Sequence, residues 1–292
     1  MNRASSPGPS SRSAIRRSTA SRSATTLSDH PIAARWRAVR AERRAALMPY
    51  VTAGYPSPAA CRDALRLAER AGADFLEVGV PFSDPLADGP TIQRSTQAAL
   101  DQGMTVAGVL DLVREARLDV PVVIMTYLNP VLAFGVERFV AAAQAAGASG
   151  LLLTDLPAGA DPALERRAAA GGLALIRLIA PTTPDSRLAE AVRGATGFIY
   201  LISRLGVTGV REQVPPDLER QVARVKAATP LPVAIGFGIG SAAQAAAAAR
   251  VADGVIVGSA LVEALGNGGL ASAERLLAEL VTAVRSAAEQ RS

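Results

Sequence analysis

From residue 45 onward, short apolar runs alternate with longer segments in which apolar side chains recur every three or four positions. The short runs are typical of buried strands, and the longer segments of amphipathic helices. The pattern predicts eight strands, at residues 47–52, 75–80, 122–126, 150–154, 174–179, 197–202, 232–236 and 254–257. It predicts helices at residues 58–71, 106–117, 136–146, 162–170, 184–192, 217–228, 242–249 and 271–289.

Strands that alternate with helices indicate a parallel sheet with crossover helices. The 292 residues allow two domains or a single barrel, and eight strand–helix units match an α/β fold of the (β/α)8 TIM barrel type. A doubly wound open sheet fits the same periodicity. In both architectures ligands bind at the carboxyl ends of the strands, so the residues that follow each strand are the functional candidates.

The amino-terminal segment differs from the rest of the chain. Residues 1–44 contain ten arginines and two acidic residues, a net charge of +8, whereas the whole chain carries +5, which leaves −3 for the other 248 residues. We expect a disordered Ser/Arg-rich extension over residues 1–40 and one catalytic domain over residues 41–292, so that removing residues 1–40 leaves folding and activity intact. A start codon placed too early and an organellar transit peptide are the alternatives.

The composition excludes several chemistries. His30 is the only histidine, Cys61 the only cysteine and Lys226 the only lysine. These counts argue against a Ser-His-Asp triad, a metal site, internal disulfides and a Schiff-base lysine, and favour a reducing, cytoplasmic location. We expect no membrane span, because no run of about 18 apolar residues occurs, and no nucleic-acid binding by the body of the chain, because its charge is not basic.

The loop after the second strand carries three carboxylates, Glu77, Asp84 and Asp88. Glu77 interrupts an apolar strand and therefore points into or over the barrel, where a carboxylate is unfavourable unless it is paired or protonated. Asp-Pro and Asp-Gly are also ordinary turn sequences, so Asp88 is a turn residue or a catalyst on spacing alone. A buried acid and a loop acid at one rim form a candidate general acid/base pair.

Glycines follow the last three strands, in the segments 206–209, 236–240 and 258–260. Backbone N–H groups at such turns bind anions, and Ser259 is placed to cap a helix, so the pattern favours a phosphate-bearing ligand over three ordinary turns. The polar segment 203–211 has the composition of a mobile lid. Aromatic and sulfur-containing side chains at strand ends either enclose a flat apolar ligand or pack the barrel interior. They are Tyr50, Phe82, Met125, Tyr127 and Phe237.

The sequence of residues 76–93, LEVGVPFSDPLADGPTIQ, closely resembles the signature of the tryptophan synthase α subunit family. Further segments agree in order along the chain, at residues 49–54, 125–130, 154–157, 200–209 and 236–239. The resemblance covers about residues 47–261 and implies a TIM barrel.

The resemblance implies a carbon–carbon lyase that cleaves indole-3-glycerol phosphate to indole and glyceraldehyde 3-phosphate in tryptophan biosynthesis. Glu77 would protonate indole C3 and take the proton of the glycerol hydroxyl, Asp88 would bind the indole N–H, and Tyr200 would support Glu77. This cleavage needs no metal, because the protonated indole accepts the electrons.

Further roles are implied by the same resemblance. The phosphate contacts would be Gly209, Gly238, Gly258 and Ser259. Thr208 and Asp155 would order the lid and the neighbouring loops, and the indole pocket would be lined by Tyr50, Met125, Leu152, Leu178 and Phe237. Three positions depart from the family pattern: Tyr50 replaces the usual Phe, Thr154 a smaller residue, and Tyr55 the usual Asp.

The resemblance also implies a partner, a tryptophan synthase β subunit in an α2β2 tetramer. The partner would carry pyridoxal phosphate, and this chain would need no cofactor. A freestanding indole-3-glycerol-phosphate lyase and a non-catalytic phosphate-binding regulatory barrel are the alternatives; Glu77 and Asp88 argue against the second, because phosphate binding needs neither.

Overall fold

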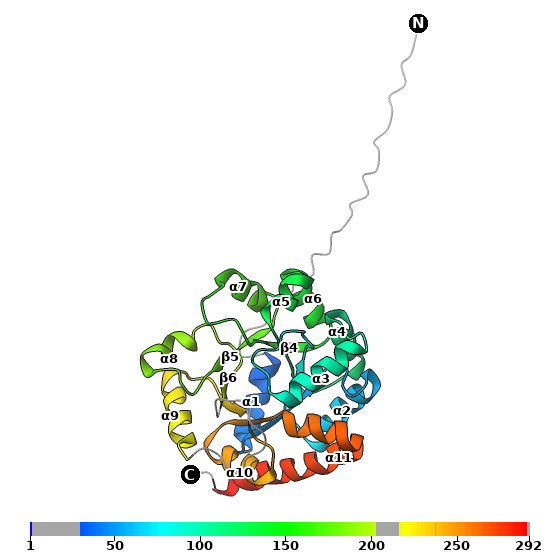
Figure 1. Cartoon of the computed structure of the whole chain (residues 1–292). Helices are drawn as coiled ribbons and strands as arrows, with labels where there is room; N and C mark the ends of the chain where they lie inside the picture. The colour runs from blue at the N-terminus through cyan, green and yellow to red at the C-terminus, as the bar shows by residue number, and fades with distance from the viewer. Residues whose placement is uncertain (2–29, 203–215, 237, 291–292) are drawn as a thin grey trace.

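A computed structural model describes residue 1 and residues 30–202, 216–236 and 238–290. Eight parallel strands form a closed barrel in chain order, with β8 paired to β1, and helices surround it (Figure 1). The strands are β1 Ala46–Thr52, β2 Leu76–Gly79, β3 Val122–Thr126, β4 Ala148–Leu153, β5 Ala174–Ile179, β6 Ile199–Ile202, β7 Val233–Gly236 and β8 Gly254–Val257. The TIM barrel prediction is confirmed and the open sheet is excluded.

The helices of the described residues follow the strands and pack on the outside of the barrel, apart from α1. They are α1 Pro31–Ala41, α2 Pro58–Ala71, α3 Pro90–Asp101, α4 Val106–Ala116, α5 Leu128–Phe134, α6 Val136–Ala145, α7 Pro162–Ala170, α8 Asp185–Ala191, α9 Leu218–Ala228, α10 Ala242–Val251 and α11 Ser259–Ser286, with the 3-10 helix η2 Ala287–Gln290.

Local sequence signals fix where these helices begin and end. In α2 the side chain of Ser57 accepts a hydrogen bond from the N–H of Ala60, and Pro58 occupies the first helical position. Gly72 ends the helix in the left-handed conformation, which glycine adopts without steric strain. In α10, Ser241 and Gln244 form a capping box.

The apolar side chains form two layers. The outer layer lies between the strands and the helices. The inner layer fills the barrel and contains the inward-facing residues of the strands, among them Met48, Val123, Ile176 and Ile256. Alternate residues of each strand therefore face opposite sides, as the two-residue period of a strand requires.

Helix α1 corrects the predicted domain boundary at residue 40. Ile32 and Trp36 are buried, and Trp36 packs on Phe75 and Phe198 with ring centroids 4.7 and 5.7 Å apart. A Cβ at Gly254 would lie 2.7 Å from the Trp36 ring, so a glycine on β8 makes room for the tryptophan. Residues 31–40 therefore belong to the folded domain, and the rest of the predicted extension, residues 2–29, lies outside the described residues.

Besides α1, two further helices, α3 and α5, were absent from the prediction, and one predicted helix was too short. Helix α3 has a weak apolar pattern, because its buried face includes Ser95 and Thr96, and α5 has only seven residues. The last predicted helix, at residues 271–289, is the second half of α11, which is kinked at Gly269. Ser259 does not cap this helix: Gly258 is the N-cap residue and Ser259 is the first helical residue.

Candidate active site

Glu77 lies inside the barrel. Its strand β2 pairs with β1 and β3, which places Glu77 in register with Tyr50 and Val123. The side chain is 1% exposed, and among the described residues no group hydrogen-bonds to its Oε1 atom. Burial, and then the charge of Asp88, raise the pKa of Glu77 to about 8. At neutral pH Glu77 is therefore mostly protonated and can donate a proton.

Asp88 lies at the end of the loop after β2, directly before α3. The backbone N–H of Asp88 donates to the carbonyl of Pro85 at 3.1 Å, and its own carbonyl accepts a hydrogen bond from the Gln93 side chain at 2.9 Å. Burial raises the pKa of Asp88 to about 6, and a hydrogen bond with Tyr127 opposes this rise. At neutral pH Asp88 is mostly ionised.

The two carboxyl groups thus have different protonation states at one end of the barrel. The pKa of Glu77 responds to the charge of Asp88, which places the two groups within electrostatic range of each other. A protonated acid beside an ionised one is the arrangement that general acid/base chemistry at neutral pH requires. The structure therefore brings together the two acids that the sequence singled out.

Two tyrosines flank this pair. Tyr50 on β1 and Tyr200 on β6 are both buried, and burial raises the pKa of each hydroxyl well above its usual value, with the charges of Glu77 and Asp88 adding to the rise. Both hydroxyls are therefore neutral. Tyr50 differs from the usual Phe of the family by its hydroxyl. This hydroxyl lies 3.4 Å from the hydroxyl of Thr52 on the same strand, so it has a polar neighbour.

Four of the five residues predicted to line the apolar pocket lie together. Tyr50, Met125 and Leu152 belong to the inner layer, and Leu178 packs against it. Tyr200, predicted to support Glu77, belongs to the same layer. Asp155 lies on the loop after β4, where its Oδ1 accepts a hydrogen bond from the N–H of Leu128 at 2.7 Å. Asp155 therefore ties the loop after β4 to the first turn of α5.

The predicted phosphate contacts are described only in part. Gly238 has a φ angle of +84°, which favours glycine. Gly258 precedes α11, and a Cβ at this position would lie 3.4 Å from the Tyr50 ring. As the N-cap residue, Gly258 has no side chain with which to cap the first turn of α11. Gly209, Thr208, Phe237 and the predicted lid at residues 203–211 lie outside the described residues.

Tyr127 is a polar contact that the sequence analysis assigned only to enclosure or packing. It follows β3, is 5% exposed, and its hydroxyl accepts a hydrogen bond from the N–H of Ala87 at 2.9 Å. The sequence showed only that a tyrosine stands at the end of a predicted strand. Nothing in the spacing identified which group its hydroxyl contacts.

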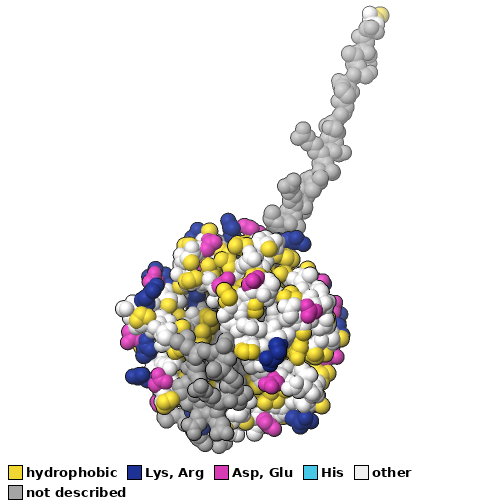
Figure 2. Space-filling view, in the orientation of Figure 1, with side chains coloured by type: hydrophobic (Ala, Val, Ile, Leu, Met, Phe, Trp, Pro, Cys, Tyr) yellow, Lys and Arg dark blue, Asp and Glu magenta, His cyan; other side chains and the backbone are white. Residues whose placement is uncertain are grey.

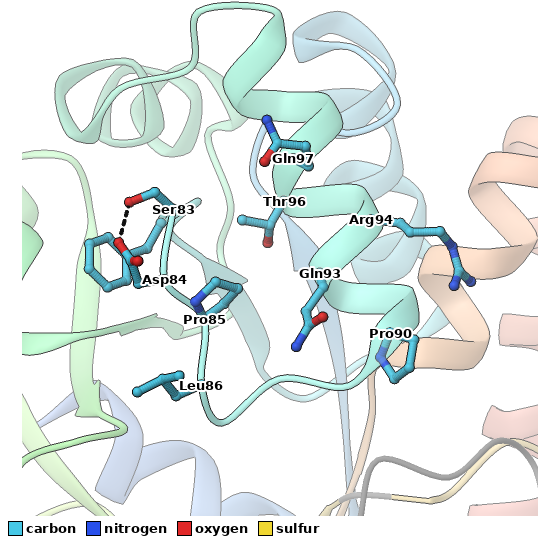
Figure 3. Close-up of a pocket in the computed structure, with 10 residues that line it drawn as sticks. Ser83, Asp84, Pro85, Leu86, Pro90, Gln93, Arg94, Thr96 and Gln97 are labelled. Atoms are coloured by element: carbon cyan, nitrogen blue, oxygen red, sulfur yellow. Dashed lines mark hydrogen bonds between the residues drawn. The ribbon is translucent and has the colours of Figure 1, made fainter.

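The outer side of the loop after β2 faces α3 across a groove of about 550 Å³ (Figure 3). In this loop Ser83 donates a hydrogen bond to the Asp84 carboxylate at 2.6 Å, so Asp84 stabilises the turn. Leu86 points away from α3 and is 93% exposed.

Three further features of the described residues concern surface charge, metal ligands and helix hydropathy. On the face shown in Figure 2, cationic and anionic side chains are interspersed around the periphery. The part of the chain that the structure describes contains no cluster of three His, Cys, Asp or Glu side chains that could hold a metal ion. Within the same residues, no helix is long and apolar enough to cross a membrane.

Known proteins resemble this chain over most of its length. The family profile described as tryptophan synthase alpha chain matches residues 36–291. A tryptophan synthase alpha chain from Caulobacter sp. (strain K31) is 48% identical over 232 residues, which are 78% of this chain and 84% of the relative. One from Caulobacter vibrioides (strain NA1000 / CB15N) is 47% identical over 262 residues, which are 87% and 95% of the two chains.

Solved structures agree as well. A chain of Mycobacterium tuberculosis tryptophan synthase superposes with a TM-score of 0.82 at 42% identity, covering 88% of this chain and 98% of that one. Tryptophan synthase subunit alpha from Legionella pneumophila str. Paris superposes with a TM-score of 0.79 at 34% identity, covering 89% and 99%.

Proposed function

This chain belongs to the tryptophan synthase alpha chain family and is a lyase of tryptophan biosynthesis, and from this premise we propose how its residues work. The substrate is indole-3-glycerol phosphate, which the chain cleaves by a retro-aldol reaction to indole and glyceraldehyde 3-phosphate. The observation that carries the proposal is the pair of buried acids, Glu77 on β2 and Asp88 at the end of the loop that follows it. Burial raises the pKa of both carboxyl groups, to about 8 for Glu77 and to about 6 for Asp88.

In the first step, protonated Glu77 gives its proton to C3 of the indole ring. The ring becomes a cation, and the positive charge is shared with the ring nitrogen. Ionised Asp88 accepts a hydrogen bond from the ring N–H and stabilises this charge. A neutral Asp88 would stabilise it far less, so the different pKa values of the two acids matter for catalysis.

In the second step, the carbon–carbon bond between the ring and the glycerol chain breaks, and its electron pair returns to the ring to restore indole. The neighbouring glycerol hydroxyl becomes the aldehyde and passes its proton to the Glu77 carboxylate, which regenerates the acid. Atoms and charges balance without a metal or an external oxidant. Tyr200 stays neutral beside Glu77 and supports it without exchanging a proton.

The substrate phosphate binds where the late strands end. Gly238, Gly258 and Ser259 supply backbone N–H groups, and the dipole at the N-terminus of α11 favours an anion there. Gly209 completes this set by family role, with Thr208 and Phe237 contributing to the lid and the pocket. Met125, Leu152 and Leu178 line the pocket for the indole ring, together with Tyr50.

The partner is a tryptophan synthase β subunit, with which the chain forms an α2β2 tetramer in the cytoplasm. The β subunit carries the pyridoxal phosphate. The exposed Leu86 on the loop after β2 is an apolar group that a partner could cover. The same loop carries Asp88, so a partner bound to this loop would also affect the active site.

The test is indole release from indole-3-glycerol phosphate by the full chain, with and without an added tryptophan synthase β subunit. We expect slow release alone and a strong rise with the partner. Fast release alone would identify a freestanding lyase, and no release in either case would contradict the proposed chemistry.

A variant locates the acid. Glu77→Gln keeps the shape of the side chain and removes its proton exchange, so we expect turnover to be abolished while the affinity for an unreactive substrate analogue stays nearly unchanged. Surviving turnover would show that another group is the acid. Binding of the analogue without turnover in the unmodified chain would favour a regulatory barrel.

A further inference from the structure

Tyr127 occupies the junction of three loops at the rim. It follows β3 directly and is the N-cap residue of α5. The loop after β2 lies on one side of it and the loop after β4 on the other, since β3 pairs with both β2 and β4. Its side chain is buried, so its position is set by these neighbours.

The side chain of Tyr127 holds both ends of the acidic loop. Its ring packs on Phe82, at the start of the loop, with centroids 5.3 Å apart and planes at 37°. Its hydroxyl accepts a hydrogen bond from the N–H of Ala87 at 2.9 Å. Asp88 is the next residue, and hydrogen bonding with Tyr127 lowers the pKa of its carboxyl group. One residue outside the loop therefore fixes the loop where it begins and where it carries its acid.

Tyr127 is in turn fixed from β4. Thr154, one of the positions where this chain departs from the family pattern, donates a hydrogen bond from its hydroxyl to the carbonyl of Thr126, the residue before Tyr127, at 3.3 Å. Asp155 accepts the hydrogen bond from the N–H of Leu128, the residue that follows Tyr127. The backbone on both sides of Tyr127 is thus held by residues that follow the next strand.

We propose that Tyr127 is a positioning residue, whose hydroxyl holds Ala87 and thereby keeps the adjacent Asp88 carboxylate at the mouth of the barrel, where it meets the indole N–H. This inference rests on the function proposed for Asp88. A carboxylate that stabilises a developing charge is effective only when it is already in place, because reorienting it during the reaction raises the barrier.

The charges at the site agree with this role. Burial and the negative charge of Asp88 raise the pKa of Tyr127, so its hydroxyl stays protonated and donates to the carboxylate. That donated hydrogen bond favours the ionised form of Asp88 and lowers its pKa. Removing the hydroxyl therefore has two effects: it frees the loop and raises the pKa of Asp88.

The test is Tyr127→Phe in the full chain, assayed for indole release with a saturating tryptophan synthase β subunit. The ring and its packing on Phe82 remain, so the fold is expected to survive, which circular dichroism checks. We expect kcat to fall by about 10- to 100-fold, the effect of losing a hydrogen bond to a charged group, with a smaller change in KM. The acid limb of the pH profile of kcat should move to higher pH.

Tyr55→Phe is the matched control. It removes a tyrosine hydroxyl from the loop after β1, where that hydroxyl lies against Gly266 of α11, and it should leave kcat and the acid limb unchanged. An unchanged kcat and acid limb in Tyr127→Phe would overturn the proposal, as would an equal effect of Tyr55→Phe.

Asp88→Asn separates this inference from the function on which it rests. If Tyr127 acts through Asp88, adding Tyr127→Phe to Asp88→Asn causes little further loss of kcat, because the two changes remove the same interaction. Losses that multiply would show that Tyr127 acts elsewhere and would overturn the inference. Full activity of Asp88→Asn would instead contradict the role of Asp88 itself.

Discussion

The hydroxyl group of Tyr50 on β1 occupies the space in which any residue larger than glycine at position 79 of β2 would place its Cβ atom. Tyr200 on β6 and Gly236 on β7 have the same relationship on the other side of the barrel. Each tyrosine ring on one strand thus lies over a glycine of the next, and the two glycines determine how closely the rings approach the acid pair.

Gly79→Ala and Gly236→Ala are expected to displace the two tyrosine rings. An added methyl group in a packed interior destabilises a protein by about 1–3 kcal/mol, and movement of the rings should also lower kcat. Urea denaturation and indole release measure the two effects. Gly89→Ala is the control for stability, because no atom lies within 4 Å of a Cβ at that position; an equal loss of stability there would contradict the explanation.

The pH profile of kcat/KM should be bell-shaped. Asp88 must be ionised and Glu77 protonated, so activity rises as the pH passes the pKa of Asp88 at about 6 and falls as it passes the pKa of Glu77 at about 8. Steady-state assays between pH 5 and 9 give the two limbs, which belong to the coupled pair. A profile that keeps rising above pH 9 would contradict the role of Glu77 as the acid.

Glu77→Gln should raise stability at alkaline pH. The pKa of Glu77 is about 8 in the folded chain against an ordinary value of 4.5, so between these values the folded state binds the proton more tightly than the unfolded state does. The stability of the unmodified chain therefore falls as the pH rises from 5 to 8, by on the order of a few kcal/mol, and the glutamine variant lacks this fall. Thermal melts of both chains at pH 5 and pH 8 measure the difference, which should be small at pH 5.

Removal of helix α1 should destabilise the barrel, contrary to what the polar amino-terminal sequence suggests. A chain that starts at His30 is expected to melt like the full chain, whereas one that starts at residue 42 loses the buried Ile32, Trp36 and Val39. Trp36→Ala alone should cost about 3–5 kcal/mol. Equal melting temperatures for the two truncated chains would show that α1 contributes nothing to stability.

Much of the barrel followed from the sequence, because strands buried on both faces are continuous apolar runs and cannot be mistaken for surface segments. All eight strands lie within two residues of their predicted limits. Glu77 was identified for the same reason, since a carboxylate inside such a run has no ordinary structural explanation.

The contacts that single side chains make across the barrel could not be predicted. Helix α1 was missed because its buried face is only Ile32, Trp36 and Val39 within an arginine-rich stretch, and what they pack on lies far away in the sequence. Tyr127 was read as enclosure or packing because its hydroxyl acts on Ala87 and Asp88, about forty residues away. Which hydroxyl meets which carboxylate depends on the register of neighbouring strands, and no local pattern carries that information.

Helix α1 closes one end of the barrel, and the inner side chains between it and Glu77 fill the interior. As far as the described residues show, a molecule bound above Glu77 therefore enters and leaves at the same end of the barrel, the end opposite α1. In the proposed reaction, indole would leave through the opening that admits indole-3-glycerol phosphate. A β subunit bound over that opening would therefore receive each indole before it reached bulk water. The closed end of the barrel is what directs the product toward the partner.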